Sequence, residues 1–179
     1  MKITMNKEQL QAFEEDIAQI FDQGLIRAPV HSDNGNEEQL IEIFKEVDEN
    51  DFVCCSWRSH YRCLLKGVPS EQLKADILAG KSITLCYKEH NIFSSAIVGG
   101  IVSIALGIAF DLKQKKSTQK VWCFVGDMTS QCGVFSEALE YAASFDLPII
   151  FVVEDNNKSV CTDTRKSWKS NFLPYEPWS

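Results

Sequence analysis

The stretch that decides the fold is VWCFVGDMTSQCGVFSEALEYAASFDLPIIFVVEDNN, residues 121–157. It contains an apolar run at 121–126, a helical pattern at about 133–144 and a second apolar run at 148–155. Short apolar runs separated by a helical segment are typical of parallel strands whose two faces are both buried. The sequence therefore predicts an α/β fold, in which helices flank a parallel sheet on both faces.

The rest of the chain adds helices and one more strand to this unit. Apolar residues at helical spacing predict helices at 7–24, 36–48 and 70–80, and DFVCCSW predicts a buried strand at 51–57. Residues 96–112 form a helix that is apolar on nearly every side, so we expect it to be buried on most sides. We expect residues 1–179 to form a single domain.

Composition excludes several classes of protein. The net charge of −7 argues against non-specific nucleic-acid binding and offers no basic face to an anionic membrane. Seven cysteines without a CxxC pair fit a reducing compartment better than a disulfide framework. The N-terminal MKITMNKEQLQ lacks the apolar core of a signal peptide, and the apolar run at 96–110 is short for a membrane span. We therefore expect a soluble, cytoplasmic protein.

Polar residues follow both strands of the 121–157 unit. Asp127 follows the first strand and Asn156 follows the second. Because a right-handed strand–helix–strand unit ends both strands at one edge of the sheet, these side chains should be neighbours. One carboxylate with amide and carbonyl oxygens suits a Mg²⁺ ion that also carries phosphate ligands. The alternative is structural, with Asp127 as an N-cap of the following helix.

The spacing of these residues resembles the thiamine-diphosphate motif, in which Gly-Asp is followed after 28 residues by Asn. Within that superfamily the chain is most similar to the alpha-type subunits of two-chain 2-oxo-acid dehydrogenases. The resemblance implies a diphosphate-side domain that uses thiamine diphosphate and Mg²⁺. It assigns the metal to Asp127, Asn156 and the carbonyl of Lys158, and it places Gly126 and Met128 beside the cofactor.

Upstream segments resemble other motifs of the family in the same order. RAPVHSDNGNEE, from residue 27, resembles the segment with an active-site histidine and implies a catalytic role for His31. CSWRSHYRCLLKG, from residue 55, resembles the (S/A)YRxHG segment. It implies that Trp57 and Arg58 lie near the diphosphate and that His60 is a second catalytic candidate at the mouth of the site. Taken alone, each of these residues also has an ordinary structural explanation, such as an ion pair for Arg58.

A third segment, SSAIVGGIVSIALGIAF from residue 94, resembles the GIVG-containing helix and implies that Ala96 and Val98 lie beside the aminopyrimidine ring. The chain also departs from the family pattern. Met128 stands where the family usually has Gly, Trp57 where it has Tyr, and Ala96 where it has Gly. The chain ends at Ser179, before further strands and helices of the family's domain, so we expect a truncated chain or a short subunit that relies on a partner.

The resemblance implies a function. We expect the diphosphate-binding subunit of a thiamine-diphosphate- and Mg²⁺-dependent enzyme that acts on a 2-oxo acid, with His31 and His60 as candidates for proton transfer. A beta-type pyrimidine-domain partner would supply the activating glutamate, in an αβ-type assembly that is most simply a heterotetramer. The chain alone should be a homo-oligomer or prone to aggregate. The alternatives are transketolase-like ketol transfer on a ketose and a degenerate, non-catalytic subunit, which Met128 favours.

Overall fold

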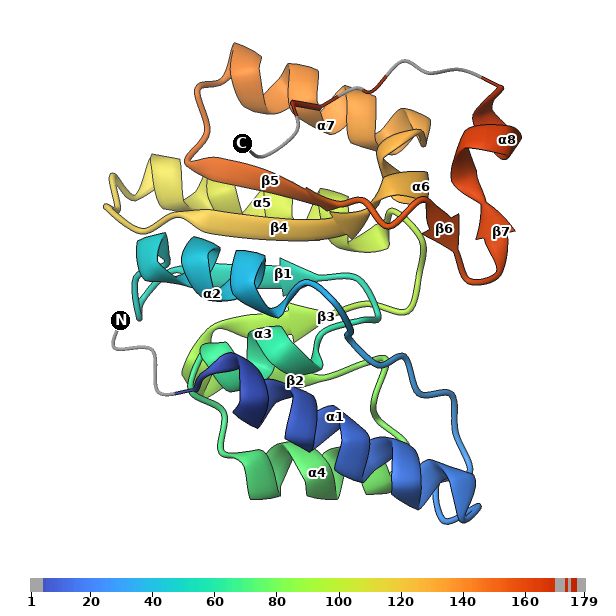
Figure 1. Cartoon of the computed structure of the whole chain (residues 1–179). Coiled ribbons are helices and arrows are strands. Elements are labelled where there is room, and N and C mark those ends of the chain that lie inside the picture. The colour runs from blue at the N-terminus through green and yellow to red at the C-terminus, as the bar shows by residue number, and fades with distance from the viewer. Residues whose placement is uncertain (1–4, 170–172, 174, 177–179) are drawn as a thin grey trace.

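The protein is described here from a computed structural model that covers residues 5–169, 173 and 175–176 (Figure 1). Its main sheet has five strands in the order β2-β3-β1-β4-β5. The strands are β1 (Phe52–Cys55), β2 (Cys86–Tyr87), β3 (Ile92–Ser94), β4 (Val121–Gly126) and β5 (Ile149–Glu154). β3, β1, β4 and β5 run parallel, whereas β2 pairs antiparallel with β3. The predicted α/β fold is confirmed, with one antiparallel edge strand added.

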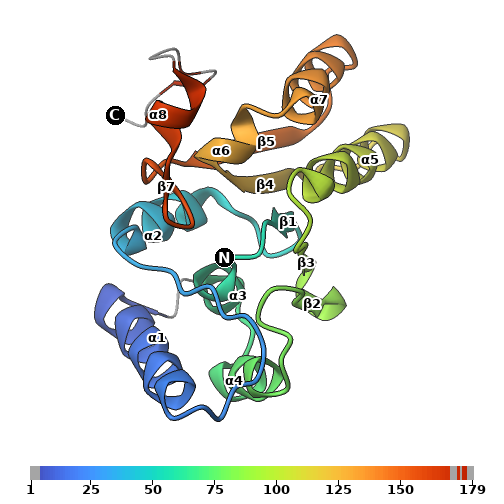
Figure 2. The same cartoon turned by 90° about the vertical axis from the view of Figure 1, so that its right-hand side faces the viewer.

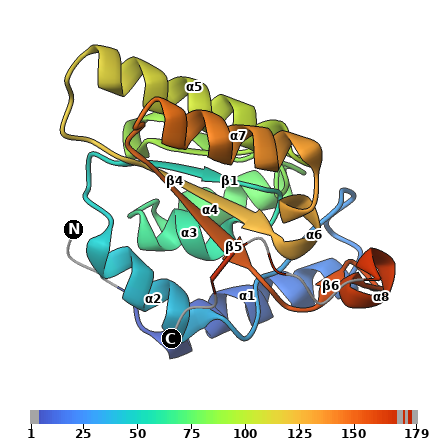
Figure 3. The ribbon, with the colours of Figure 1, turned by 90° about the horizontal axis from the view of Figure 1, so that it is seen from above.

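Helices cover both faces of this sheet, as Figures 2 and 3 show. One face packs against α1 (Lys7–Asp22), α2 (Glu37–Glu46), α3 (His60–Leu65) and α4 (Ser70–Leu78), and the other against α5 (Gly100–Gln114) and α7 (Gly133–Ser144). The strands alternate accordingly. Trp122 and Phe124 face the first layer, whereas Val121 and Cys123 face the second. Two buried clusters therefore enclose the sheet.

The helix predicted at 96–112 is shorter at its start and less buried than expected. It begins at Gly100, because Gly99 has a left-handed backbone (φ 73°) that separates the helix from the loop before it. One face is buried, through Ile101, Val102, Ala105, Ala109 and Leu112. Ile104 on the opposite face is 52% exposed. Within the described residues the prediction of burial on most sides is wrong, because this helix packs mainly against the sheet and α7.

Short elements follow the carboxyl ends of β4 and β5. These are α6 (Asp127–Ser130), the hairpin formed by β6 (Lys158–Ser159) and β7 (Thr162–Asp163), and α8 (Thr164–Trp168); a further 3-10 turn, η1 (Lys88–His90), joins β2 to β3. In Figure 1 the first four lie together at one end of the sheet. Across the described part of the chain, the helices lack the combination of length and apolar character that a bilayer span requires.

Candidate functional site

A cavity of about 80 Å³ lies at the carboxyl ends of β4 and β5. Gly126 and Glu154 are partners in the β4–β5 register, so the loops after the two strands begin at the same level. The cavity is lined by His31, Ser56, Trp57, Arg58, Val98, Gly126, Asp127, Met128, Thr129, Glu154, Asn156, Lys158, Ser159 and Val160. It therefore gathers every predicted site residue except His60 and Ala96. A larger hollow of about 630 Å³, lined by residues of 46–51 and 117–120, lies at the opposite edge of the sheet and holds none of them.

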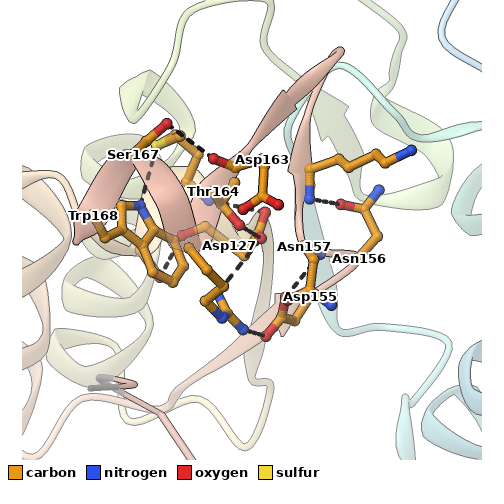
Figure 4. A network of polar contacts seen from close by, with 12 residues as sticks. Asp127, Asp155, Asn156, Asn157, Asp163, Thr164, Ser167 and Trp168 are labelled. Carbon is orange, nitrogen blue, oxygen red and sulfur yellow. Dashed lines mark hydrogen bonds and ion pairs between the residues drawn. The ribbon is translucent and has the colours of Figure 1, made fainter. Parts of the chain in front are cut away.

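Asp127 is the first residue of α6, and its carboxylate is buried, with 1% of the residue exposed. Its Oδ1 accepts a hydrogen bond from the backbone N–H of Met128 at 3.0 Å, and its Oδ2 accepts one from the hydroxyl of Thr164 at 2.6 Å (Figure 4). Burial raises the pKa of Asp127, and the neighbouring carboxylate of Asp155 raises it further. The chain's own donors thus orient this carboxylate.

Asp155 forms a second acidic group beside Asp127. It pairs with Arg165 and accepts hydrogen bonds from the hydroxyl of Tyr175 at 2.7 Å and the backbone N–H of Asn157 at 3.1 Å. Burial opposes ionisation of this carboxyl, but these donors outweigh it and lower the pKa of Asp155. Arg165 Nη1 also lies 3.9 Å from Oδ2 of Asp127. One guanidinium therefore offsets the charge of both carboxylates.

Met128, the residue that departs from the family's glycine, has a partner in the C-terminal segment. The indole N–H of Trp168 donates to Sδ of Met128 at 3.2 Å. The guanidinium of Arg165 stacks over the Trp168 ring, 4.4 Å from its centroid. Met128 thus connects α8 to α6, the helix that begins at Asp127, and nothing in the local sequence around residue 128 signals this contact.

Asn156 and Lys158 reach the same cavity from the loop after β5. Oδ1 of Asn156 accepts the backbone N–H of Lys158 at 2.9 Å. Figure 4 shows the Asn156 amide directed away from Asp127, on the opposite side of the chain from Asp155. The structure therefore brings the three predicted metal ligands to one cavity, while the amide oxygen of Asn156 is held within its own loop.

The donor set at this cavity fits Mg²⁺ better than a transition metal. Asp127, Asn156 and the Lys158 carbonyl offer only oxygen atoms, the ligand type that Mg²⁺ takes together with ligand phosphates. Within the described residues, His, Cys, Asp and Glu side chains do not form a group of three that could hold a metal. A cation here would thus need oxygens from a bound ligand as well.

His31, Trp57 and Arg58 form another part of the cavity wall. The His31 and Trp57 rings lie 5.9 Å apart between centroids. Burial lowers the pKa of His31, and the positive charge of Arg58 lowers it further, so the imidazole is neutral near pH 7. Nε of Arg58 is buried without a hydrogen-bond partner among the described residues. An unpaired guanidinium donor at this wall suits an anionic ligand such as a diphosphate.

His60 and Ala96 do not line the cavity. His60 is fully buried, with Nδ1 2.9 Å from Oε1 of Glu14 and Nε2 2.9 Å from Oγ of Ser82. It is the first residue of α3, which directs it into the core while Arg58 stays at the cavity. Ala96 is exposed in the loop before α5, and Val98 of the same loop lines the cavity.

A buried polar network beneath the His31 loop is not evident from the sequence. Arg62 of α3 lies 2.6 Å from Asp33 and also pairs with Glu154 at the end of β5. Tyr61 donates its hydroxyl to Oε1 of Glu37 at 3.1 Å. Charged residues in the His31 segment and after His60 were the available signal, but they have no fixed spacing that identifies partners.

Comparison with known proteins gives consistent results. A family model for the dehydrogenase E1 component matches residues 5–173. The chain is 33% identical over 165 residues to a pyruvate dehydrogenase E1 component subunit alpha from Porphyra purpurea, covering 83% of this chain and 48% of that protein. It is 28% identical over 165 residues to the alpha subunit of acetoin:2,6-dichlorophenolindophenol oxidoreductase from Bacillus subtilis, covering 86% and 49%.

The fold has a counterpart among solved structures. A protein from Mycobacterium smegmatis, described as a thiamin diphosphate-dependent enzyme, superimposes with a TM-score of 0.51 at 20% identity, over 73% of this chain and 23% of that one. The present chain spans about half the length of the curated relatives it matches. The match over residues 5–173 confirms the resemblance read from the motifs. The chain belongs to the dehydrogenase E1 component family, in which its relatives named above are described as alpha subunits.

Proposed function

We propose that this chain is the diphosphate-binding subunit of a thiamine-diphosphate- and Mg²⁺-dependent enzyme that acts on a 2-oxo acid together with a beta-type partner. One observation carries the proposal. Residues from three separate segments, represented by His31, Arg58 and Asp127, meet at a single cavity at the carboxyl edge of the sheet. The alpha subunit of pyruvate dehydrogenase among its relatives supports a 2-oxo acid as the substrate.

Each residue has a defined task in this proposal. Asp127, Asn156 and the carbonyl of Lys158 would hold the Mg²⁺, and Arg58 would contact the diphosphate. Bound thiamine diphosphate would supply the electron sink for breaking the bond next to the substrate carbonyl. His31, neutral near pH 7, would accept and return a proton at the open side of the cavity.

A non-catalytic subunit is the second candidate. Two observations favour it: Arg165 already supplies a positive charge 3.9 Å from Oδ2 of Asp127, and Met128 replaces the family's usual glycine. Such a subunit would keep the fold and the partner interface without holding the cofactor. Cofactor binding, rather than turnover, separates the two candidates.

The test is a calorimetric titration of thiamine diphosphate with Mg²⁺ into the full chain, with and without its co-purified beta-type partner. Asp127→Ala removes a metal ligand and should weaken cofactor binding by at least about 10- to 100-fold. Asp22→Ala is the matched control, because Asp22 is an exposed carboxylate at the end of α1. Equal affinities for the wild type and Asp127→Ala would reject the site, and binding absent in every sample would favour the non-catalytic subunit.

A further inference from the structure

A buried bridge joins the two sides of the cavity. Arg62 of α3 is fully buried, and its Nη1 donates to Oδ1 of Asp33 at 2.6 Å. Its Nη2 donates to Oε1 of Glu154. Asp33 is two residues after His31, and Glu154 is two residues before Asn156. One guanidinium therefore connects the loop that carries the proposed proton-transfer group to the strand end that leads into the proposed metal site.

Asp33 is held by two hydrogen bonds in addition to its ion pair with Arg62. Its Oδ2 accepts the backbone N–H of Tyr61 at 3.2 Å, and its own N–H donates to Oε1 of Glu14 at 3.1 Å. The same oxygen of Glu14 lies 2.9 Å from Nδ1 of His60. His60 thus supports the His31 loop from below, through Glu14 and the Asp33 backbone.

The far end of the loop is anchored to the same residues. The amide of Asn36 donates to Oε1 of Glu154 at 3.0 Å, and the N–H of Gly35 donates to Oε1 of Glu37 at 2.9 Å. Residues 25–36 form neither helix nor strand. Side-chain contacts, and not a backbone ladder, therefore hold the His31 loop in place.

We propose that Arg62 is a positioning residue that sets the separation between His31 and the metal end of the cavity, acting through Asp33 and Glu154. The chemistry of arginine fits this task, because its planar fork can bind two carboxylates at once in a fixed geometry. The ring of Phe124 lies 5.5 Å from the guanidinium carbon and restrains the fork from one side. The expected effect on turnover rests on the role proposed for His31. The effect of Arg62 on the position of the His31 loop does not.

Arg62→Lys is the informative variant, because lysine keeps the charge but cannot bridge both carboxylates with one rigid group. The first readout is the imidazole NMR spectrum of the full chain with labelled histidine. His31→Gln assigns the signal among the three histidines. In Arg62→Lys the His31 signal should lose the ring-current shift from Trp57, and its pKa should rise toward the ordinary value. An unchanged signal and pKa would overturn the inference.

Two controls separate positioning from general destabilisation. Arg27→Lys changes an exposed arginine at the start of the same loop and should leave the His31 signal unchanged. Leu112→Ala weakens the other buried cluster and should lower stability without moving that signal. Should Arg62→Lys fail to fold, Asp33→Asn weakens the same bridge more gently and is read in the same way.

The second readout is turnover by the chain with its partner. Arg62→Lys should lower kcat by about 10- to 100-fold, because a displacement of about 1 Å of a reacting group has effects of this size. The affinity for thiamine diphosphate should change less than kcat. Adding Glu154→Gln to Arg62→Lys should lower kcat little further, because both substitutions break the same bridge. If the wild-type protein binds no cofactor, the proposed function is rejected, and the NMR readout alone decides the positioning role. If Arg62→Lys has the same kcat as the wild type, the positioning role is overturned.

Discussion

The hydroxyl of Thr164 donates a 2.6 Å hydrogen bond to Oδ2 of Asp127, although the two residues are 37 positions apart in the sequence. Thr164 is fully buried, and so is the carboxylate that it contacts. The first turn of α8 therefore closes over the start of α6. This contact makes the proposed metal ligand depend on a segment beyond both strands of the motif.

The contact between Thr164 and Asp127 predicts a loss of stability when the hydroxyl is removed. Thr164→Val leaves a buried carboxylate oxygen without its donor, which typically costs about 1–3 kcal/mol. Thr164→Ser keeps the hydroxyl and is the matched control. Urea denaturation of the three proteins measures the free energy of unfolding, and equal values for Thr164→Val and wild type would contradict the prediction.

The environment of His31 predicts a depressed pKa. Burial is the largest cause and the charge of Arg58 adds to it, so the pKa of His31 should lie below its usual 6.5. Arg58→Gln should raise this pKa only in part, because burial remains. An NMR titration of the imidazole tests both statements, and His31→Gln assigns the signal. A pKa that does not respond to Arg58→Gln would show that Arg58 lies farther from the ring.

The buried ammonium of Lys66 predicts a pH dependence of stability. Nζ of Lys66 donates to the carbonyls of Asp48 and Glu49 at 2.8 and 2.7 Å, and the residue is 3% exposed. Burial lowers the pKa of Lys66 from 10.5 to about 8, although Asp51 and Asp48 act in the opposite direction. Between pH 8 and 10.5 the unfolded chain thus binds more protons than the folded one, and stability contributed by this group rises with pH.

Lys66→Met isolates that contribution. The difference in unfolding free energy between wild type and Lys66→Met should shift in favour of wild type as the pH rises from about 8 to 10. Urea denaturation at several pH values in this window gives the slope. A difference that is flat or falls with pH would indicate that the ammonium keeps its usual pKa in the folded chain.

Arg165 predicts a competition between its own charge and a bound cation. Its Nη1 lies 3.9 Å from Oδ2 of Asp127 and its Nη2 pairs with Asp155. Arg165→Gln removes a positive charge beside the proposed metal ligand, so Mg²⁺ should bind about fivefold more tightly in the presence of thiamine diphosphate. Lys166→Gln, an exposed neighbour, is the control for net charge. Calorimetric titration with Mg²⁺ measures the affinity of both variants, and weaker binding in Arg165→Gln would contradict this prediction.

The sequence predicted the location of those site residues whose positions depend on the order of strands and helices alone. Asp127 and Asn156 line the same cavity because β4 and β5 end at the same level, and an apolar run followed by a polar loop indicates such an end. It gave no indication of β2 and β3, since strands of two or three residues carry no periodic pattern. Contacts such as Thr164 to Asp127 follow no spacing rule, so they needed the folded chain.

His60 illustrates a different limit. Its motif correctly indicated that the segment lies at the cavity, where Trp57 and Arg58 are found. Helix α3 begins at His60, however, and turns this side chain toward Glu14 in the core. Motif similarity thus located the segment, whereas the direction of one side chain depended on where a helix starts.

The hairpin of β6 and β7 carries an exposed cysteine at the edge of the cavity. Cys161 is exposed between the two strands, next to Val160, which lines the cavity. Burial raises the pKa of the Cys54 thiol to about 12 and raises those of Cys55, Cys63 and Cys123, so these thiols should resist alkylation. With Cys86 and Cys132 replaced by serine, a maleimide dye would therefore attach at Cys161 and report by fluorescence when a ligand enters beside it.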